Sequence, residues 1–380
     1  MKLLLVFIIF FTLTKSFSQS IKISLFNGQT VKTSVISTVS GSFILKDKQQ
    51  VIDRFEEPVI LYISLIGNQL YVKGIGKPYG FFDKLVLEPS SDTCIFSVKP
   101  VSPSLSGREY RGNLYLSVDY NRILMINELD LDEYLAGVVE AEGGPNATSE
   151  YYKAQAILCR TYALKNLKRH IEEEFNLCDE VHCQAYKGRC RINESILYSC
   201  KITNGLVAVH SDTSLITAAF HANCGGETQD ANNIWLISKP YLVSVKDPYC
   251  LNKHGANWGK NLPVSEWKDY LVKKGFDLVN LTSIKNFSRE VVHRTNFYKI
   301  NNDSILFNKL RTDWKLKSSF FSVIQKENVI TLKGKGYGHG VGMCQEGAME
   351  MSTRGFSFKQ IIDFYYKDVQ IINYKAEHVF

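Results

Sequence analysis

The sequence predicts an α+β protein, with helices and antiparallel strands around a cleft and a small all-β N-terminal subdomain. Two observations predict this class. Short alternating apolar runs broken by turn residues fill the first hundred positions, and the later helical and strand patterns lack the βαβ alternation of a doubly wound sheet. The 380 residues are 45% hydrophobic and 22% charged, which is ordinary for a folded chain with room for two or three compact units.

The first 18 residues predict export. Met1 and Lys2 precede an unbroken apolar run over residues 3–11, and Ser16 and Ser18 stand two apart before Gln19. This pattern is typical of a signal peptide cleaved after Ser18, although Lys15 lies where the flanking charge of an uncleaved anchor would sit. The run is short for a bilayer span, and no second segment is suited to one. We therefore expect a protein of the periplasm or cell envelope.

The elements expected after the leader define a β-rich N-terminal domain over residues 19–105 and a second domain over residues 106–380. The alternating run from Ile21 to Phe26, turned by Asn27 and Gly28, is typical of its strands. In order, we expect strands at 21–26, 59–66 and 85–87, a hairpin over 111–128, a helix over 150–173 capped by Thr148 or Ser149, β runs at 206–210 and 214–221, a helix over 267–275, paired strands over 320–332, and a helix over 357–366.

The charge and the cysteine content limit the possible partners and the redox state of the chain. The net charge of +7 is spread along the chain without a basic block, which argues against a nucleic-acid partner and is compatible with an anionic wall. Aromatic residues make up 12%, which suits sugar rings as well as ordinary cores. Nine cysteines in an exported chain predict disulfides with one thiol left over, and the spacing does not fix the pairing.

Two carboxylates, Glu140 and Glu142, end an apolar segment just before Gly143 and Gly144. A partly desolvated acid at such a position can hold a proton near neutral pH, whereas a carboxylate beside a turn is otherwise simply solvated. On the helix that follows, Lys153 and Arg160 are seven apart and share a face. They could orient the acid or hold an anionic or polyhydroxylated substrate.

Three further segments carry histidines. Five glycines in nine residues surround His339, so the backbone there can approach a ligand closely. His221 lies in a loop that continues through Cys224 to Thr228. The segment Cys178–Cys190 contains three cysteines and His182, which could bind zinc, but it lacks Cys-x2-Cys spacing and export favours disulfides.

In this order, the segments resemble the SpoIID/LytB family of stage II sporulation D and amidase-enhancer proteins, over roughly residue 111 to the C-terminus. The most specific matches are Tyr134–Glu142, Lys153–Ala163, His182-Cys183-Gln184, His221 with Gly225, Gly226 and Thr228, and Gly338–Gln345. The resemblance implies a lytic transglycosylase that cuts the MurNAc–GlcNAc bond of peptide-stripped peptidoglycan strands. It places the catalytic acid/base on Glu142 and substrate-binding residues at Lys153, Arg160, Gln184, His221, His339 and Gln345.

The implied chemistry needs a single carboxyl group. It protonates the leaving oxygen and then deprotonates the C6 hydroxyl of muramic acid, which attacks its own ring carbon to give a 1,6-anhydro end. Departures from the family pattern are Gly143-Gly144 in place of Met-Pro, and Cys224 and Cys344 in place of serine. Because the family implies that the last two lie around one cleft, we expect them to form a disulfide.

Some family members bind zinc near the equivalents of Cys178, His182 and Cys183, but the spacing differs here, so we expect no cofactor and keep a structural zinc as the alternative. A non-catalytic peptidoglycan-binding amidase enhancer is the runner-up function, and a cell-wall amidase is its expected partner. A metal hydrolase built on His182, His221 and His339 is a third hypothesis, which a chelator would inactivate.

Overall fold

The computed structural model describes residues 19–235, 238–278 and 287–374, so the predicted signal peptide lies outside the described residues. The chain divides into two compact units, one up to Tyr134 and one from Leu135. Within the described ranges, no helix has both the length and the apolar character needed to cross a membrane.

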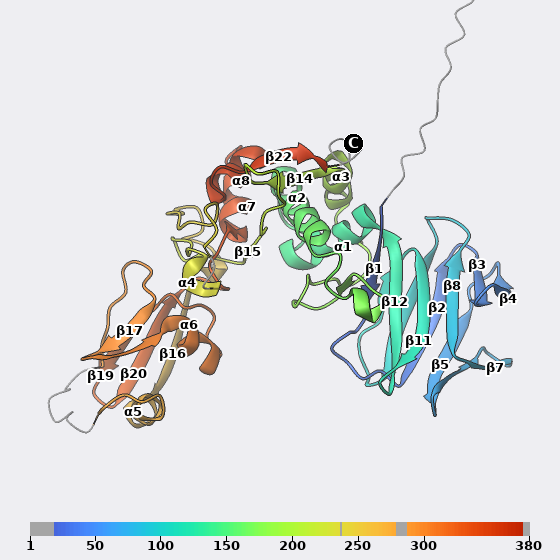
Figure 1. Cartoon of the computed structure of the whole chain (residues 1–380), viewed down its shortest axis with the longest axis horizontal. Helices are drawn as coiled ribbons and strands as arrows, with labels where there is room; N and C mark the ends of the chain where they lie inside the picture. Colours follow the sequence, from blue (N-terminus) through green and yellow to red (C-terminus); the bar gives the residue numbers. More distant parts are fainter. Residues whose placement is uncertain (1–18, 236–237, 279–286, 375–380) are drawn as a thin grey trace, which may run out of the picture. The chain divides into compact units, whose positions relative to one another are not determined.

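The first unit consists of two antiparallel sheets (Figure 1). In the first, the strands run in the order β1 (Ser20–Ser24), β12 (Arg122–Asp130), β11 (Asn113–Asp119), β8 (Lys84–Pro89), β3 (Phe43–Asp47) and β4 (Gln50–Phe55). The second has the order β10 (Arg108–Tyr110), β9 (Ile95–Ser102), β2 (Thr33–Ser40), β5 (Ile60–Ile66), β6 (Gln69–Lys73) and β7 (Pro78–Phe82).

The two sheets bury their apolar faces against each other. Strand β11 contacts β6, β12 contacts β5, and the rings of Phe43 and Phe96 meet edge to face at 6.3 Å. The predicted hairpin is confirmed as β11 and β12, turned at Tyr120 and Asn121. Because Leu114 of β11 pairs with Leu87 of β8, this hairpin belongs to the β unit. The compact unit therefore ends at Tyr134, and the expected boundary at residues 105 and 106 falls inside it.

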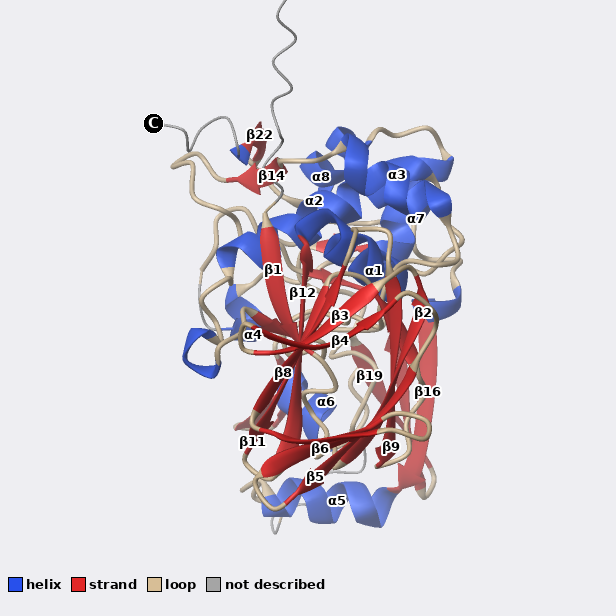
Figure 2. Cartoon of the chain, turned by 90° about the vertical axis from the view of Figure 1, so that its right-hand side faces the viewer, coloured by secondary structure: helices blue, strands red, loops and turns tan. Residues whose placement is uncertain are grey.

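The second unit is organised around helix α2 (Ser149–Lys165), most of which is buried. It contacts α3 (Glu194–Ile202), α7 (Gln345–Thr353) and α8 (Phe358–Tyr365), which lie together in Figure 2. Helix α1 (Leu131–Gly143) leads into this unit. Helix α2 ends earlier than the sequence predicted because Asn166 caps it, with Nδ2 donating to the carbonyl of Tyr162; only a 3-10 turn, Ile171–Glu173, follows.

Short strands and one small sheet complete this unit. The sheet β16 (Asn257–Pro263), β20 (Val329–Lys335) and β19 (Phe321–Lys326) packs on α5 (Val264–Lys273), with a core that contains Trp267. The remaining elements are β13 (Leu177–Cys178), β14 (Leu206–Val209) paired with β22 (Gln370–Asn373), β15 (Phe220–His221) paired with β21 (Met343–Cys344), α4 (Asn232–Trp235), β17 (Phe297–Ile300) paired with β18 (Asp303–Leu306), and α6 (Phe307–Asp313). Helices and mainly antiparallel strands thus confirm the α+β class.

Candidate functional site

Glu142 lies in the last turn of α1, which buries most of its apolar residues and ends where Gly144 adopts a left-handed conformation with φ of 70°. The side chain is half-buried, and its Oε1 accepts a hydrogen bond of 2.8 Å from the backbone N–H of Ala185. The backbone carbonyl of Glu142 accepts another, at 3.1 Å, from Nε2 of Gln345. The carboxyl group is therefore held from two distant parts of the chain.

The surroundings of Glu142 favour its protonated form. Burial raises the pKa of this carboxyl above its ordinary value, and the Ala185 N–H and the cation of Lys187 only partly offset that rise. The last turn of a helix acts in the same direction, because the helix dipole disfavours a negative charge there. A carboxyl with a raised pKa in a cavity is suited to general acid catalysis.

Glu142 lines a cavity of about 540 Å³. Among the described residues around this cavity, Glu142 is the one carboxylate and Arg169 the one arginine or lysine. The full lining consists of Glu142, Tyr162, Arg169, Val181, His182, Cys183, Gln184, Thr217, Ala218, Ala219, Phe220, Trp235 and His339. The structure thus brings together Glu142, Gln184 and His339 of the residues predicted from the sequence.

His339 reaches the cavity from the glycine-rich loop. Its Nδ1 accepts a hydrogen bond of 3.0 Å from the backbone N–H of Val341, and its ring lies 5.5 Å from those of both Trp235 and His221. Burial, with the nearby cation of Arg311, lowers the pKa of His339 to about 4. The ring is therefore neutral at pH 7 and suited to hydrogen bonding rather than to the role of primary acid.

His221 lies behind His339, buried and outside the cavity lining. Its Nδ1 donates to the carbonyl of Val341 at 3.1 Å, so the neutral ring leaves a lone pair on Nε2. Burial and the neighbouring His339 lower its pKa well below the usual value. The two rings can approach because Gly338, with φ of 111°, lies where a Cβ would come within 2.8 Å of the Cβ of His221.

The two cations of α2 that were expected to reach the site, Lys153 and Arg160, have other partners. Lys153 forms an ion pair of 2.6 Å with Glu150. Arg160 is 1% exposed and donates to the backbone carbonyls of Cys200, Thr203 and Leu206 at 2.8–3.1 Å, at and just beyond the end of α3. Neither is among the described residues that line the cavity. Arg160 is placed to join α2 to α3 rather than to touch a substrate, because its donors are directed at buried carbonyls.

Two glutamines, Gln184 and Gln345, hold backbone segments of the site through hydrogen bonds. Gln184 is 2% exposed, and its Nε2 donates to the carbonyl of Cys159 at 3.4 Å while the residue also lines the cavity. Gln345 begins α7 and holds the backbone of Glu142, so it is a positioning residue.

The sequence reasoning missed three residues of the cavity wall. Tyr162 is hydrogen-bonded by Arg169, which also donates to the carbonyl of His182 at 2.9 Å. Trp235 is 38% exposed beside His339. An exposed tryptophan and a half-buried tyrosine on the cavity wall are suited to sugar rings. The signal for Tyr162 was its place within the Lys153–Ala163 match, whereas nothing in the spacing of Arg169 and Trp235 relates them to Glu142.

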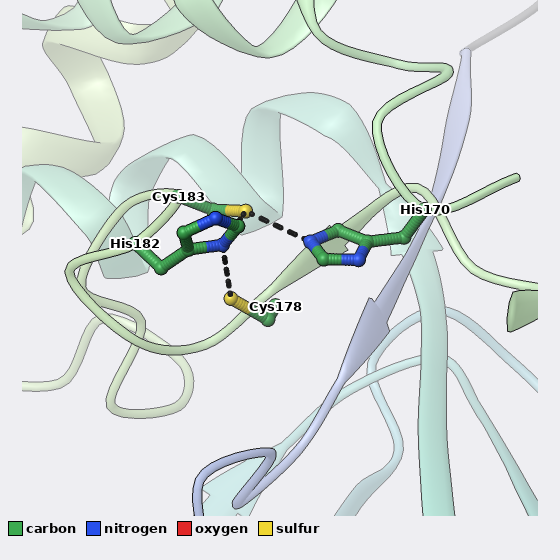
Figure 3. Close-up of side chains that lie close together, drawn as sticks. All are labelled: His170, Cys178, His182 and Cys183. Carbon is green, nitrogen blue, oxygen red and sulfur yellow. Dashed lines mark hydrogen bonds between the residues drawn. The ribbon is translucent and has the colours of Figure 1, made fainter.

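A group of four potential metal ligands, His170, Cys178, His182 and Cys183, reaches the cavity wall through His182 and Cys183 (Figure 3). Their ligand atoms all lie within 4.8 Å of one another, with Cys183 Sγ 3.5 Å from His170 Nε2 and Cys178 Sγ 3.8 Å from His182 Nδ1. The hydrogen bond from Cys178 lowers the pKa of the Cys183 thiol to about 6.

This donor set fits zinc. Two thiolates and two imidazoles are a common tetrahedral set for a structural ion. Glu173 contacts the other nitrogen of His170 at 2.6 Å, as an outer carboxylate often does in such sites. His170 is the ligand that the sequence reasoning did not include. The three histidines of the hydrolase hypothesis are not gathered in this way, because neither potential metal group of the described residues contains His221 or His339.

The predicted disulfides are not formed. All nine cysteines, each within the described residues, are buried free thiols, and the pair expected from Cys224 and Cys344 is unbonded. Cys224 and Cys344 do lie together, as the family resemblance implied, but in a group that also contains Cys250.

Comparison with known proteins identifies the family of this chain. The family model described as "Stage II sporulation protein", SpoIID, matches residues 119–211, which include Glu142, Gln184 and the four potential zinc ligands. An uncharacterized protein of Brachyspira hyodysenteriae is 32% identical over 71% of this chain and 74% of its own length. The chain belongs to the SpoIID/LytB family.

Other relatives carry the two names associated with this family. Stage II sporulation protein D of Bacillus subtilis is 27% identical over 65% of this chain and 75% of its own length. The amidase enhancer of the same organism is 27% identical over 71% of this chain and 45% of its own length. The SpoIID/LytB match thus extends well beyond the region of the family model.

Proposed function

We propose that this chain is an exported lytic transglycosylase that cuts peptide-stripped glycan strands of peptidoglycan with Glu142 as its acid/base catalyst. Membership of the SpoIID/LytB family supports a role in the cell wall. The observation that carries the finer proposal is a single carboxylate, with a raised pKa, among the described residues around the cavity. Glycosidases that recruit water ordinarily use two carboxylates.

The chemistry requires one group to act twice. Protonated Glu142 donates its proton to the glycosidic oxygen as the bond to the muramic anomeric carbon breaks. The resulting carboxylate then takes the proton of the C6 hydroxyl, whose oxygen closes onto that carbon to form the 1,6-anhydro ring. The intramolecular hydroxyl replaces an activated water, because effective molarities of well-placed groups are very high. The proton of Glu142 is restored at the end of the turnover.

The cavity wall is suited to the stripped strand. When an amidase removes the stem peptide, the lactyl group of each muramic residue is left with a free carboxylate. Arg169 is exposed at the cavity and can pair with that group. Trp235 and Tyr162 offer aromatic faces to the sugar rings. The neutral ring of His339 extends this wall beside Trp235.

A structural zinc on His170, Cys178, His182 and Cys183 is part of the proposal. These residues form one side of the cavity through His182 and Cys183. When bound, the ion supplies crosslinking and no reaction chemistry. It would hold the loop that also carries Gln184 and Ala185, the residue whose N–H contacts Glu142.

The decisive test is mass spectrometry of glycan strands, intact and amidase-treated, after incubation with the purified chain. We expect anhydro ends, mainly from the treated strands. Glu142→Gln keeps the size of the side chain but cannot carry a proton, so it should lower the rate by at least ~10²–10⁴-fold. Strand binding, measured by pull-down, should survive.

Each other outcome identifies an alternative. Reducing ends in place of anhydro ends would mean a hydrolase. Unchanged strands that still bind would favour the amidase-enhancer function named for one relative, and stimulation of an added amidase would then be measured. Normal release of anhydro ends by Glu142→Gln would contradict the assignment of the catalyst.

A further inference from the structure

A second group of potential ligands lies away from the cavity lining, in the core of the second unit. It consists of Cys224, Asp247, Cys250 and Cys344, all 0% exposed, with their ligand atoms within 4.8 Å of one another. They come from three separate parts of the sequence: the loop after β15, the loop around Asp247 and Cys250, and strand β21. The proposed reaction uses none of them.

The contacts within this group converge on one point. Cys224 Sγ lies 3.3 Å from Cys250 Sγ and donates to Asp247 Oδ2 at 3.2 Å. The backbone N–H of Cys224 donates to Cys344 Sγ at 3.2 Å. Gly225 and Gly226, with φ of 73° and 99°, direct their backbone N–H groups at Cys250. Backbone N–H donors around sulfur favour the thiolate form that binds metals.

A disulfide would leave one sulfur of this group, and its carboxylate, without a covalent or metal bond. It could join only two of the three sulfurs and would leave the third thiol beside a buried carboxylate. Asp247 is 0% exposed, and its two oxygens accept hydrogen bonds only from Tyr365 at Oδ2 (2.9 Å), from the N–H of Tyr249 at Oδ1 (2.9 Å) and from the Cys224 thiol among the contacts described. Burying an acidic group has a cost that a cation removes. A tetrahedral ion would satisfy the three sulfurs and the carboxylate together.

We propose that Cys224, Asp247, Cys250 and Cys344 bind a structural zinc ion, separate from the one assigned to His170, Cys178, His182 and Cys183. Thiolate and carboxylate are both ordinary zinc ligands, and four protein ligands make a closed, non-catalytic site. The thiol protons are released to solvent as the ion binds, and binding is coupled to folding because the site is buried.

The neighbouring cation offsets the remaining negative charge. Arg294 donates from Nη2 to the carbonyl of Cys224 at 2.7 Å and from Nε to the carbonyl of Glu227 at 2.6 Å. A guanidinium is charged at neutral pH, so Arg294 partly compensates the thiolates.

An ion at this group would influence the cavity, because its ligands are close in sequence to residues that support Glu142 and His339. Cys344 directly precedes Gln345, which holds the backbone of Glu142, and Cys224 is three residues after His221. Strands β15 and β21 also pair in parallel, with His221 opposite Cys344. An ion bound here would tie together the segments that support the acid and the histidine pair.

The test is zinc content per chain, measured by atomic emission on the full-length protein after purification without added metal. We expect about two ions in the unmodified chain, about one in Cys250→Ser, and about one in Cys178→Ser, which removes only the cavity-side site. Cys94→Ser is the matched control, because Cys94 is buried in the first unit and belongs to neither group. It should keep both ions.

X-ray absorption at the zinc edge tests the proposal on the unmodified chain, so it does not depend on the folding of any variant. In the unmodified chain we expect between two and three sulfurs per zinc, at about 2.3 Å, as the average of the two sites. One ion per chain with two sulfurs, or a linked Cys224–Cys250 peptide in non-reducing mapping, would overturn the proposal. Either outcome leaves the assignment of Glu142 untouched, because the readout is not activity.

Discussion

Glu140 and Glu142 are separated by the geometry of α1. Side chains two positions apart on an α-helix point about 200° apart, so the two carboxylates lie on opposite faces. Glu142 faces the cavity, whereas Glu140 accepts hydrogen bonds from the N–H groups of Arg191 and Ile192, the latter at 2.8 Å. An extended segment would have put both on one face, and the helix removes that ambiguity.

This arrangement predicts opposite effects for two matched substitutions. Glu140→Gln should keep cleavage close to normal but lower the free energy of unfolding by about 1 kcal/mol, because charged acceptors hold amides more strongly than neutral ones. Glu142→Gln should abolish cleavage and keep the free energy of unfolding close to normal. Urea unfolding and release of anhydro ends are measured on both. Loss of cleavage in Glu140→Gln alone, with normal stability, would move the catalyst by two residues.

The pH dependence of cleavage should follow the protonation of Glu142. The reaction begins with the acid form, so kcat/KM falls as pH rises through the Glu142 pKa. Exposed Lys187 lowers that pKa. Lys187→Met should therefore raise it and move the alkaline limb to higher pH, by a fraction of a pH unit because exposed charges are screened. Lys201→Met, at an exposed position on α3, is the control. A limb that moves to lower pH would contradict this electrostatic assignment.

At the scale of elements, Arg160 links α2 to α3. Its guanidinium spans three carbonyls, which a lysine ammonium cannot match with the same fork geometry. Arg160→Lys should lower the free energy of unfolding by about 2–4 kcal/mol, since buried carbonyls lose their donors. Urea unfolding followed by tryptophan fluorescence measures this, with exposed Lys168→Met as control. An unchanged midpoint together with a raised KM would instead support a direct role in substrate binding.

The elements that the sequence predicted are those with local signals. Helix α8 begins at a capping box formed by Ser357 and Gln360, and the hairpin of β11 and β12 has turn residues between alternating runs. Helix α1 was seen only as an apolar segment, because it is buried and lacks an amphipathic pattern. The early end of α2 depends on one side chain of Asn166, which a helical pattern does not reveal.

The site was predicted only in part, because motif order identifies residues without giving the direction of their side chains. Glu142, Gln184 and His339 meet at the cavity as the family resemblance implied. Arg160 could not be recognised as buried, since its partners lie about forty residues further along the chain. The three-cysteine group depends in the same way on contacts between segments more than ninety residues apart.

At the scale of the whole molecule, the two units allow separate readouts. All four tryptophans, Trp235, Trp258, Trp267 and Trp314, follow Tyr134, so fluorescence reports only on the second unit. Both proposed zinc sites also lie there. The first unit has its own core between two sheets and contains neither potential metal group of the described residues. A change in metal content should therefore affect the tryptophan fluorescence of the second unit more than the circular dichroism of the strands in the first unit.

We predict that a strong chelator lowers the thermal midpoint seen by tryptophan fluorescence and leaves a second, strand-dominated transition in circular dichroism unchanged. Structural zinc contributes directly to folding free energy, so removal of two ions should cost several kcal/mol in the unit that holds them. Readdition of zinc should restore the midpoint, which excludes irreversible damage. Cys178→Ser, with one site left, should show a smaller chelator effect than the unmodified chain. Identical fluorescence midpoints with and without chelator would contradict both zinc sites and leave the transglycosylase proposal to its own test.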